Sequence, residues 1–258
     1  MINDPSVRDK LYERLRRPVN PDTVSGSLPV LFFGDIDKAT IATVGINPSY
    51  QEYLDPKGQP LPEGRRRFET LKSLDAPTRA ALTDEQCERA ISDMRSYFQP
   101  GKPVYNKWFG SLDLVTQAMG YSYVKSEVVS LDLIQEATDP IWSDLKKKYP
   151  NEVKELLAAD LPFLRWQLAT FPLLAVVCNG MTPLRCVCSL LDKPVSVDTI
   201  VRGQVGGKTW YATRGLVASR ALIIVGWNTP LTQPPGLTTA DKANLGRQLR
   251  QAIDELEQ

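Results

Sequence analysis

Four polar side chains lie close to the ends of apolar segments of the chain. They are Asn47, Asp132, Asn179 and Asn228. Because ligands of open α/β sheets bind at the carboxyl ends of the strands, we expect these four side chains to converge on one pocket. Their amides and carboxyl can hydrogen-bond a polar ligand and orient a water molecule.

The 258-residue chain contains no histidine. This excludes hydrolases of the Ser-His-Asp and Cys-His types, HExxH metalloproteases and every His-bound metal site. Acid–base chemistry near neutral pH would therefore fall to carboxyl groups. The four cysteines form no CxxC pair, so we expect free thiols and neither a metal nor another cofactor; they are Cys87, Cys178, Cys186 and Cys188.

The charges of the chain nearly cancel, with 31 basic against 30 acidic residues. The field of the whole molecule would not draw it to nucleic acid, so a polyanionic partner must be held by local basic patches. Two clusters qualify, one at Arg65, Arg66 and Arg67 and one at 146–148. Both are typical of solvated surfaces. We expect phosphate contacts from the arginine cluster, because it follows the loop after Asn47.

No apolar run reaches about 18 residues, so we expect no membrane span and no membrane partner. The amino-terminal segment is charged throughout and does not resemble a signal peptide. Together with the free thiols, these features predict a cytoplasmic protein. We expect it to be a monomer.

The chain alternates between apolar strands and helices. Strands are predicted at 40–44, 127–133, 173–178 and 221–225, a pattern typical of an α/β domain. The prediction is a single domain spanning 1–258, with a central, mostly parallel four-stranded sheet flanked by helices. A further strand is predicted at 30–33, a hairpin strand at 208–213, and a polar surface loop at 51–67.

Two motifs in this framework resemble those of a known family. The sequence GINPS at 45–49 resembles the first motif of the uracil-DNA glycosylase superfamily, in the GINP form of its mismatch-specific branch. The sequence WNTPLT at 227–232 resembles the second motif, and SLD at 130–132 occupies the intermediate strand. The order and spacing fit the family across most of 29–250. The resemblance implies a uracil-DNA-glycosylase-like fold that flips a nucleotide out of DNA and hydrolyses its N-glycosidic bond.

The resemblance assigns Asn47 to positioning the attacking water; the alternative is a simple turn residue before proline. Asp132 stands where the family carries an Asn that reads uracil. A protonated Asp132 would donate to N3 of cytosine and accept from its exocyclic amine, and burial favours that form. It would instead cap local backbone groups if it had no reading role.

The first motif departs from the family at Ser49, where classical members carry a Tyr that blocks groups on pyrimidine C5. A small Ser49 leaves room for such groups, unless it is only a turn serine. With Asp132, it favours cytosine bearing a C5 substituent. We expect Tyr50 and Phe68 to line the same pocket, with packing roles as the alternative.

In the second motif, Trp227 takes the place of the family's His. Stacking on the base and core packing are equally compatible with this Trp. Asn228 would donate to the departing base, and Leu231 falls at the wedge that fills the space left by the flipped base. Thr229 and Thr232 match serines that grip phosphates. Asn179 would add a contact to the base, or turn the chain into the next helix.

These observations predict a monofunctional DNA glycosylase, since no lysine stands at a motif to form a Schiff base. The expected substrate is hydroxymethylated or glucosylated cytosine in double-stranded phage DNA, and the product is an abasic site. Repair of uracil or of a mismatched pyrimidine is the first alternative. A non-catalytic protein that binds modified DNA is the second, and a hydrolase of free nucleosides is a third.

Overall fold

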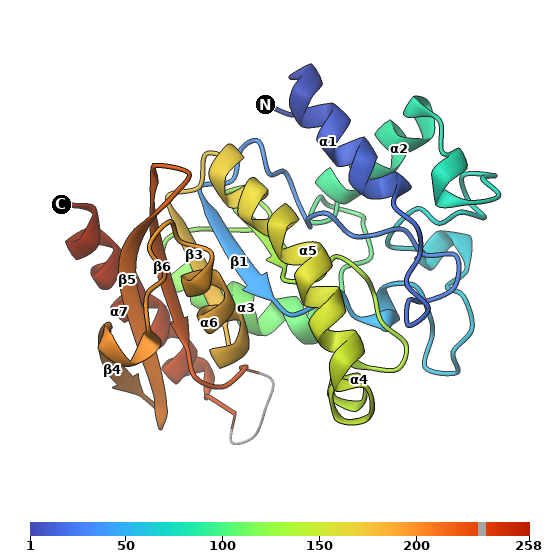
Figure 1. Ribbon diagram of the computed structural model, residues 1–258. Coiled ribbons are helices and arrows are strands. Elements are labelled where there is room, and N and C mark those ends of the chain that lie inside the picture. The colour runs from blue at the N-terminus through green and yellow to red at the C-terminus, as the bar shows by residue number, and fades with distance from the viewer. Residues whose placement is uncertain (232–235) are drawn as a thin grey trace.

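A six-stranded sheet lies at the centre of the molecule (Figure 1). The computed structural model describes residues 1–231 and 236–258. The strand order is β2-β1-β3-β6-β5-β4. The first four of these are parallel, and β5 and β4 form an antiparallel edge. The strands are β1 (Ile41–Gly45), β2 (Val128–Asp132), β3 (Ala175–Asn179), β4 (Val201–Val205), β5 (Lys208–Val217) and β6 (Arg220–Trp227).

The predicted α/β class and the four parallel strands are confirmed, but the expectation of a four-stranded sheet is wrong. The hairpin predicted from 208–213 exists and adds both of its strands to the sheet. Its turn is Gly206-Gly207, with φ of 53° and 75°, and such two-residue turns favour glycine. The β4 strand is largely exposed and has little apolar alternation, which is why its sequence gave no strand signal.

The segment 30–33 is not a strand. Val30, Leu31, Phe32 and Phe33 are all buried, which explains the apolar pattern. Only Phe33 bridges the sheet, through an isolated antiparallel pairing with Ser130. This segment is therefore irregular chain that lies beside β2 and packs in the core. Its apolar sequence pattern is the same as that of a buried strand.

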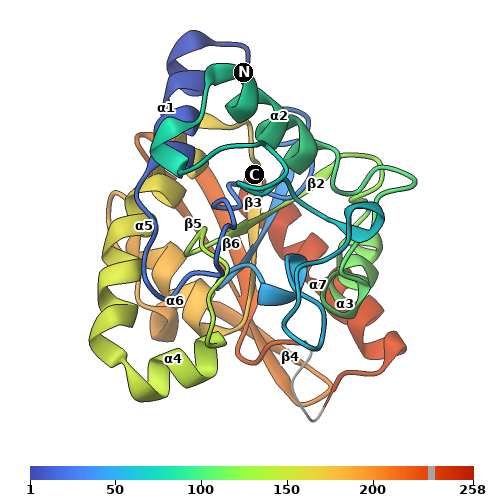
Figure 2. The ribbon, with the colours of Figure 1, turned by 90° about the vertical axis from the view of Figure 1, so that its right-hand side faces the viewer.

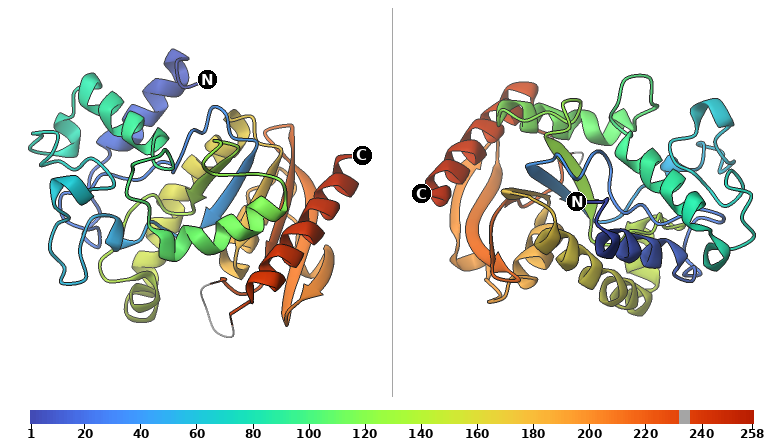
Figure 3. Two further views of the ribbon diagram at one scale, coloured as in Figure 1. Left: turned by 180° about the vertical axis from the view of Figure 1, so that it is seen from behind. Right: turned by 90° about the horizontal axis from the view of Figure 1, so that it is seen from above.

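Helices cover both faces of the sheet (Figure 3). The central strands are buried along their whole length, so each face needs a cover. One face carries α3 (Asn106–Ala118) and α7 (Thr239–Glu257), which pack against each other. The other carries α5 (Pro150–Thr170) and α6 (Met181–Ser189). The buried face of α7 includes Leu245, Leu249 and Ile253, at helical spacing.

Three further helices lie beyond these layers. At the end of the molecule opposite α4 (Trp142–Lys148), α1 (Pro5–Arg16) lies beside α2 (Asp84–Arg95) (Figure 2). The side chain of Asp4 caps α1, and Thr83 with Gln86 forms a capping box on α2. Both helices therefore begin at residues fixed by local hydrogen bonds. None of the helices in the described residues is long and apolar enough to cross a membrane.

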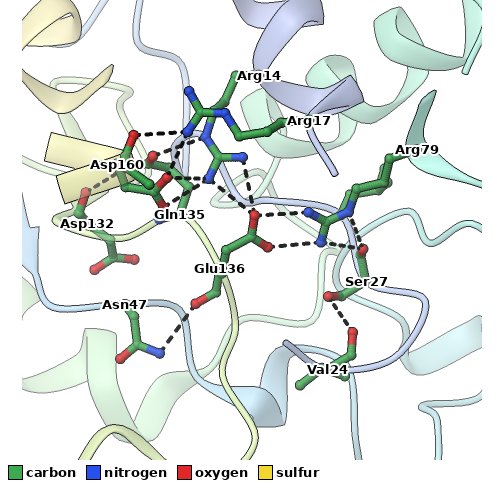
Figure 4. A network of polar contacts seen from close by, with 12 residues as sticks. Arg14, Arg17, Val24, Ser27, Asn47, Arg79, Asp132, Gln135, Glu136 and Asp160 are labelled. Atoms are coloured by element: carbon green, nitrogen blue, oxygen red, sulfur yellow. Dashed lines mark hydrogen bonds and ion pairs between the residues drawn. The ribbon is translucent and has the colours of Figure 1, made fainter. Parts of the chain in front are cut away.

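A buried ionic network ties α1 to the segment that follows β2 (Figure 4). Arg14 lies 2.8 Å from Asp160 and 3.2 Å from Glu136, and Arg79 lies 2.9 Å from Glu136. Each of these four side chains is at most 5% exposed. Burial acts to raise the pKa of Glu136, but Arg79 and Arg14 outweigh it and hold that pKa below its ordinary value. The Glu136 carboxylate is therefore charged and held between two guanidinium groups.

Arg79→Met should be strongly destabilising, because it leaves the buried Glu136 with too little positive charge. The expected loss in free energy of unfolding is about 3–5 kcal/mol, as for other broken buried pairs. The control is Arg89→Met, which removes a half-exposed pair with Glu69 at 3.3 Å and should cost about 1 kcal/mol or less. Urea unfolding at pH 7 measures both. Equal costs would show that the network contributes no more than a surface pair.

Candidate functional site

A pocket of about 310 Å³ opens at the carboxyl ends of β1, β2 and β3. Its size is that of a small-molecule site. Three of the four polar side chains singled out in the sequence line it: Asn47, Asp132 and Asn179. The strand order β2-β1-β3 brings them together, because three adjacent parallel strands end at one edge.

The pairing of β1 with β2 places Gly45 directly beside Asp132. A Cβ at position 45 would lie 2.5 Å from Oδ1 of Asp132, closer than two such atoms approach. Ser130 and Asp132 are two residues apart on β2, so both project to the same face and line the pocket. Because the glycine of the first motif has no side chain, it leaves the space that the Asp132 carboxyl occupies.

The carboxyl of Asp132 is buried and accepts no hydrogen bond from any described residue, although the residue as a whole is 6% exposed. Burial raises its pKa well above the ordinary value, and the negative charge of Glu52 raises it further. Both effects favour the protonated acid. A protonated carboxyl that lines a pocket offers one donor and one acceptor to a ligand.

Glu52 is a pocket residue that the sequence prediction missed. It ends the short 3-10 helix η1 (Tyr50–Glu52), inside the segment predicted to be a surface loop, yet it is only 1% exposed. The hydroxyl of Tyr97 donates to its carboxylate at 2.9 Å, and Nε of Arg67 lies 3.8 Å away. Burial raises the pKa of Glu52 to about 7, against the opposing effects of Arg67 and Tyr97. The pocket therefore holds a carboxyl that titrates near neutral pH.

Asn47 is held through its amide nitrogen. Nδ2 donates to the backbone oxygens of Pro48 and Glu136, at 3.1 and 3.4 Å, and to Oγ1 of Thr138 at 3.0 Å. Backbone oxygens only accept hydrogen bonds, so these contacts fix the orientation of the amide. No described residue donates to Oδ1. The amide therefore keeps a free acceptor at the pocket, and its donor side is tied to the segment that the ionic network holds (Figure 4).

Asn179 is oriented in the opposite sense. Its Oδ1 accepts from Nε1 of Trp227 at 3.0 Å and from the backbone N–H of Leu231 at 3.1 Å. Among the described residues, none accepts from Nδ2. Asn179 is 3% exposed and lines the pocket, so it offers a donor there. Along the sheet edge, β2 therefore ends in the carboxyl of Asp132, β1 is followed by the amide acceptor of Asn47, and β3 ends in the amide donor of Asn179.

The structure places Ser49 and Tyr50 in the pocket lining. Ser49 also has the turn role weighed from the sequence, because its Oγ accepts from the backbone N–H of Gln51 at 3.2 Å. Phe68 does not reach the pocket; it is 1% exposed and stacks on Tyr97 within the core. The expected pocket position of Phe68 is therefore wrong.

In the second motif, one of the two alternatives for Trp227 is selected, and Asn228 and Leu231 differ from the expectation. Trp227 is fully buried, so it packs in the core and does not stack on a ligand. Asn228 is not among the residues that line the pocket, and its Oδ1 is buried without a hydrogen-bond partner in the described residues. Leu231 is 3% exposed, so the expected exposed wedge is absent. Trp227 is buried as the last residue of β6, and Asn179 accepts hydrogen bonds from its Nε1 and from the backbone N–H of Leu231.

The remaining candidates for phosphate contact lie outside the pocket lining. Thr229 is half-buried, and Thr232 lies outside the described residues. Arg65 is exposed, whereas Arg66 pairs with Glu69 at 3.3 Å. Arg67 donates to the backbone oxygen of Gln51 and lies over the ring of Tyr105, 5.6 Å from its centroid. Arg67 is thus engaged behind the pocket lining, and of the arginine cluster only Arg65 is free of an ion pair in the described residues.

Aromatic side chains complete the pocket. They come from the start of α3 and of α4, and they are Tyr105, Trp108, Phe109 and Trp142. Their sequence positions resemble ordinary core positions, so no local signal separates them from packing residues. Flat aromatic faces beside a few polar groups suit a planar ring. No group of three or more His, Cys, Asp or Glu side chains in the described residues is placed to hold a metal ion.

The sequence was compared with protein-family models and with curated proteins. No family model matches it, and no curated protein matches it.

Glu52→Gln should change stability in a pH-dependent way. The folded state raises the pKa of Glu52 from 4.5 to about 7, so its contribution to stability is complete below pH 4.5 and lost as pH rises through 7. The variant cannot ionise there. Relative to wild type, it should gain about 3 kcal/mol between pH 4.5 and pH 8.

Urea unfolding of both proteins across this pH range measures the difference. Glu63→Gln, at an exposed position in the same loop region, is the control and should show none. A constant difference between wild type and Glu52→Gln at all pH values would mean that Glu52 is ionised normally in the folded protein.

Proposed function

We propose that the protein is a DNA glycosylase that hydrolyses the N-glycosidic bond of a flipped cytosine carrying a C5 substituent. The observation that carries the proposal is the carboxyl of Asp132. It is buried, has no hydrogen-bond partner among the described residues, and lines a pocket with an amide acceptor and an amide donor. Its oxygens are not among the fully enclosed atoms that lack a partner, so they face the pocket space, where a ligand can complete their hydrogen bonds.

The strength of the acceptor on the base favours cytosine. The protonated carboxyl of Asp132 donates to N3 and accepts from the exocyclic amine. The proton can sit on either carboxyl oxygen, but N3 of cytosine is a much more basic acceptor than O4 of uracil. The donor also stabilises the negative charge that the base acquires as it leaves.

Asn47 and Asn179 support the two remaining parts of the reaction. The free Oδ1 of Asn47 accepts a hydrogen bond from water and directs its lone pair toward C1′ of the sugar. The C1′–N1 bond breaks with its electron pair passing to the base, and the water oxygen bonds to C1′. The water gives up a proton and the base takes one up. Nδ2 of Asn179 donates to the base, in place of the role first assigned to Asn228.

The C5 substituent is supported by the wall that faces the first motif. Ser49 is small, and its hydroxyl caps a turn and does not fill the pocket. The wall continues through Tyr105, Trp108 and Trp142, whose faces pack well on rings. Hydroxymethylated and glucosylated cytosine occur in some phage DNA, so we propose a defensive role in the host cell. An enzyme that removed plain cytosine would destroy its own genome.

The test is incubation with duplexes that carry uracil, cytosine, hydroxymethylcytosine or its glucosylated form. Free base and alkali-labile abasic sites are then measured. Release from the modified-cytosine duplexes is expected. Release of uracil alone would support the alternative that the protein is a uracil-repair glycosylase. Tight binding without release would make the protein a reader of modified DNA.

Asp132→Asn should shift the preference away from cytosine-type bases. An amide is a weaker donor to N3 than a carboxylic acid, and a poorly matched buried contact costs about 1–3 kcal/mol, or roughly tenfold or more in relative rate. Asp113→Asn is the matched control, since Asp113 is on α3 with a pKa also raised by burial but does not line the pocket. The measurement is the excision rate of each variant and of wild type on the four duplexes, which gives the base preference of each protein. An unchanged ranking would remove Asp132 from base selection.

Asn47→Ala should abolish base release while leaving the fold intact. Loss of one such electrostatic contact lowers the rate by about 100- to 1,000-fold. Asn228→Ala is the control, because that asparagine follows a strand but lies outside the pocket lining. Single-turnover kinetics on a modified duplex compares the two. A comparable loss in Asn228→Ala would return the leaving-group role to Asn228.

A further inference from the structure

The mouth of the pocket carries an exposed apolar side chain. Ile141 lines the pocket and is 45% exposed. Among the pocket-lining residues, it is the one large apolar side chain with this degree of exposure. A single exposed apolar residue is ordinary on a protein surface, so the relevant observation is its position at the pocket mouth.

Ile141 is held on a rigid base. Its backbone oxygen accepts from the N–H groups of Asp144 and Leu145, at 2.9 and 3.0 Å, so Ile141 caps the start of α4. Leu145 is fully buried and anchors the helix. On the other side, the N–H of Asp139 donates to the backbone oxygen of Asp22 at 2.9 Å. The side chain is therefore presented by fixed backbone on both sides.

The helix that Ile141 begins carries one exposed acidic residue, Asp144, in its first turn and is basic in its last turn. Lys146, Lys147 and Lys148 form its last turn and are all exposed. No described carboxylate lies within ion-pair distance of any of them. Tyr149 follows, 45% exposed. In Figure 1, α4 lies at the edge of the molecule toward which β1 points, the edge at which the pocket opens.

We propose that Ile141 and α4 form the surface that receives duplex DNA around the flipped nucleotide. Ile141 fills the space that the flipped base leaves in the stack, and Lys146, Lys147 and Lys148 contact phosphates. The inference rests on the proposed function only in that the pocket receives a base from a duplex. In this proposal Ile141, and not the buried Leu231, is the residue that inserts into the base stack.

The first experiment measures the salt dependence of duplex binding. The triple variant Lys146→Gln, Lys147→Gln, Lys148→Gln is compared with Lys38→Gln, Lys125→Gln, Lys193→Gln, which changes lysines before β1, before β2 and after α6. Each phosphate contact contributes about 0.9 to the slope of log affinity against log salt. The α4 variant should lose about 2–3 from the slope, and the control variant should match wild type.

The second experiment tests the wedge. Ile141→Ala should lower base release from duplex DNA by about tenfold or more and lower release from single strands much less, because a single strand has no stack to fill. Val124→Ala, at a 59% exposed residue just before β2, is the control. The fluorescence of 2-aminopurine beside the target nucleotide reports flipping without any need for base release. Both positions are exposed, so the variants should fold as wild type.

The outcomes separate this inference from the glycosylase proposal. If wild type binds and flips the base in a way that depends on Ile141 and α4 but releases no base, the surface is supported and the glycosylase function fails. If base is released but neither variant differs from its control, the function is supported and the surface is overturned. Equal losses of release from duplex and single strands in Ile141→Ala would place Ile141 inside the pocket and overturn the wedge. Absence of duplex binding by wild type would also overturn the surface.

Discussion

The buried ion network around Glu136 is the interaction on which the site depends. Arg14 and Arg79 reach Glu136 from two distant parts of the chain and fix the segment that leaves β2. The same residue's backbone oxygen accepts from Asn47, so the loop after β1 is held to the loop after β2. Removing charged groups from water is unfavourable, and the network is stable only because each charge is paired. The pocket edge is thus fixed by groups that do not themselves line the pocket.

Without histidine, the pocket relies on carboxyl groups that differ in their surroundings. Asp132 has no donor, whereas Glu52 has Tyr97 and Arg67 beside it. Their pKa values rise for the same first reason, which is burial, and the charge of Glu52 adds to the rise at Asp132. Two neighbouring acids that repel each other do not ionise together readily. Tyr97 donates to the Glu52 carboxylate and favours its charged form, whereas Asp132 has no such donor and its raised pKa favours the acid that can donate.

The parallel strands were predictable because their apolar runs end in polar residues, as at Cys178-Asn179. The same rule found Asn47, Asp132 and Asn179, since parallel strands share an edge. It failed for Asn228, which follows a strand but does not line the pocket. The wedge role that the resemblance implied for Leu231 failed because Leu231 is buried, with its backbone N–H bonded to the side chain of Asn179. The sequence prediction missed Glu52 because the burial of this residue depends on Tyr97, which is 45 residues away in the chain. Local patterns report strands, whereas burial of a loop residue depends on its distant partners.

The contact between Gly45 and Asp132 has a consequence for how this site can change over time. Oδ1 of Asp132 occupies the volume where any side chain at position 45 would begin. A larger residue at position 45 is admissible only if position 132 first becomes small, and that step removes the carboxyl. The two positions are therefore expected to vary together in related chains, as a linked pair. A substitution of Gly45 alone would clash with Asp132, and a substitution of Asp132 by a small residue alone would remove the carboxyl. Selection would therefore act on the two positions together.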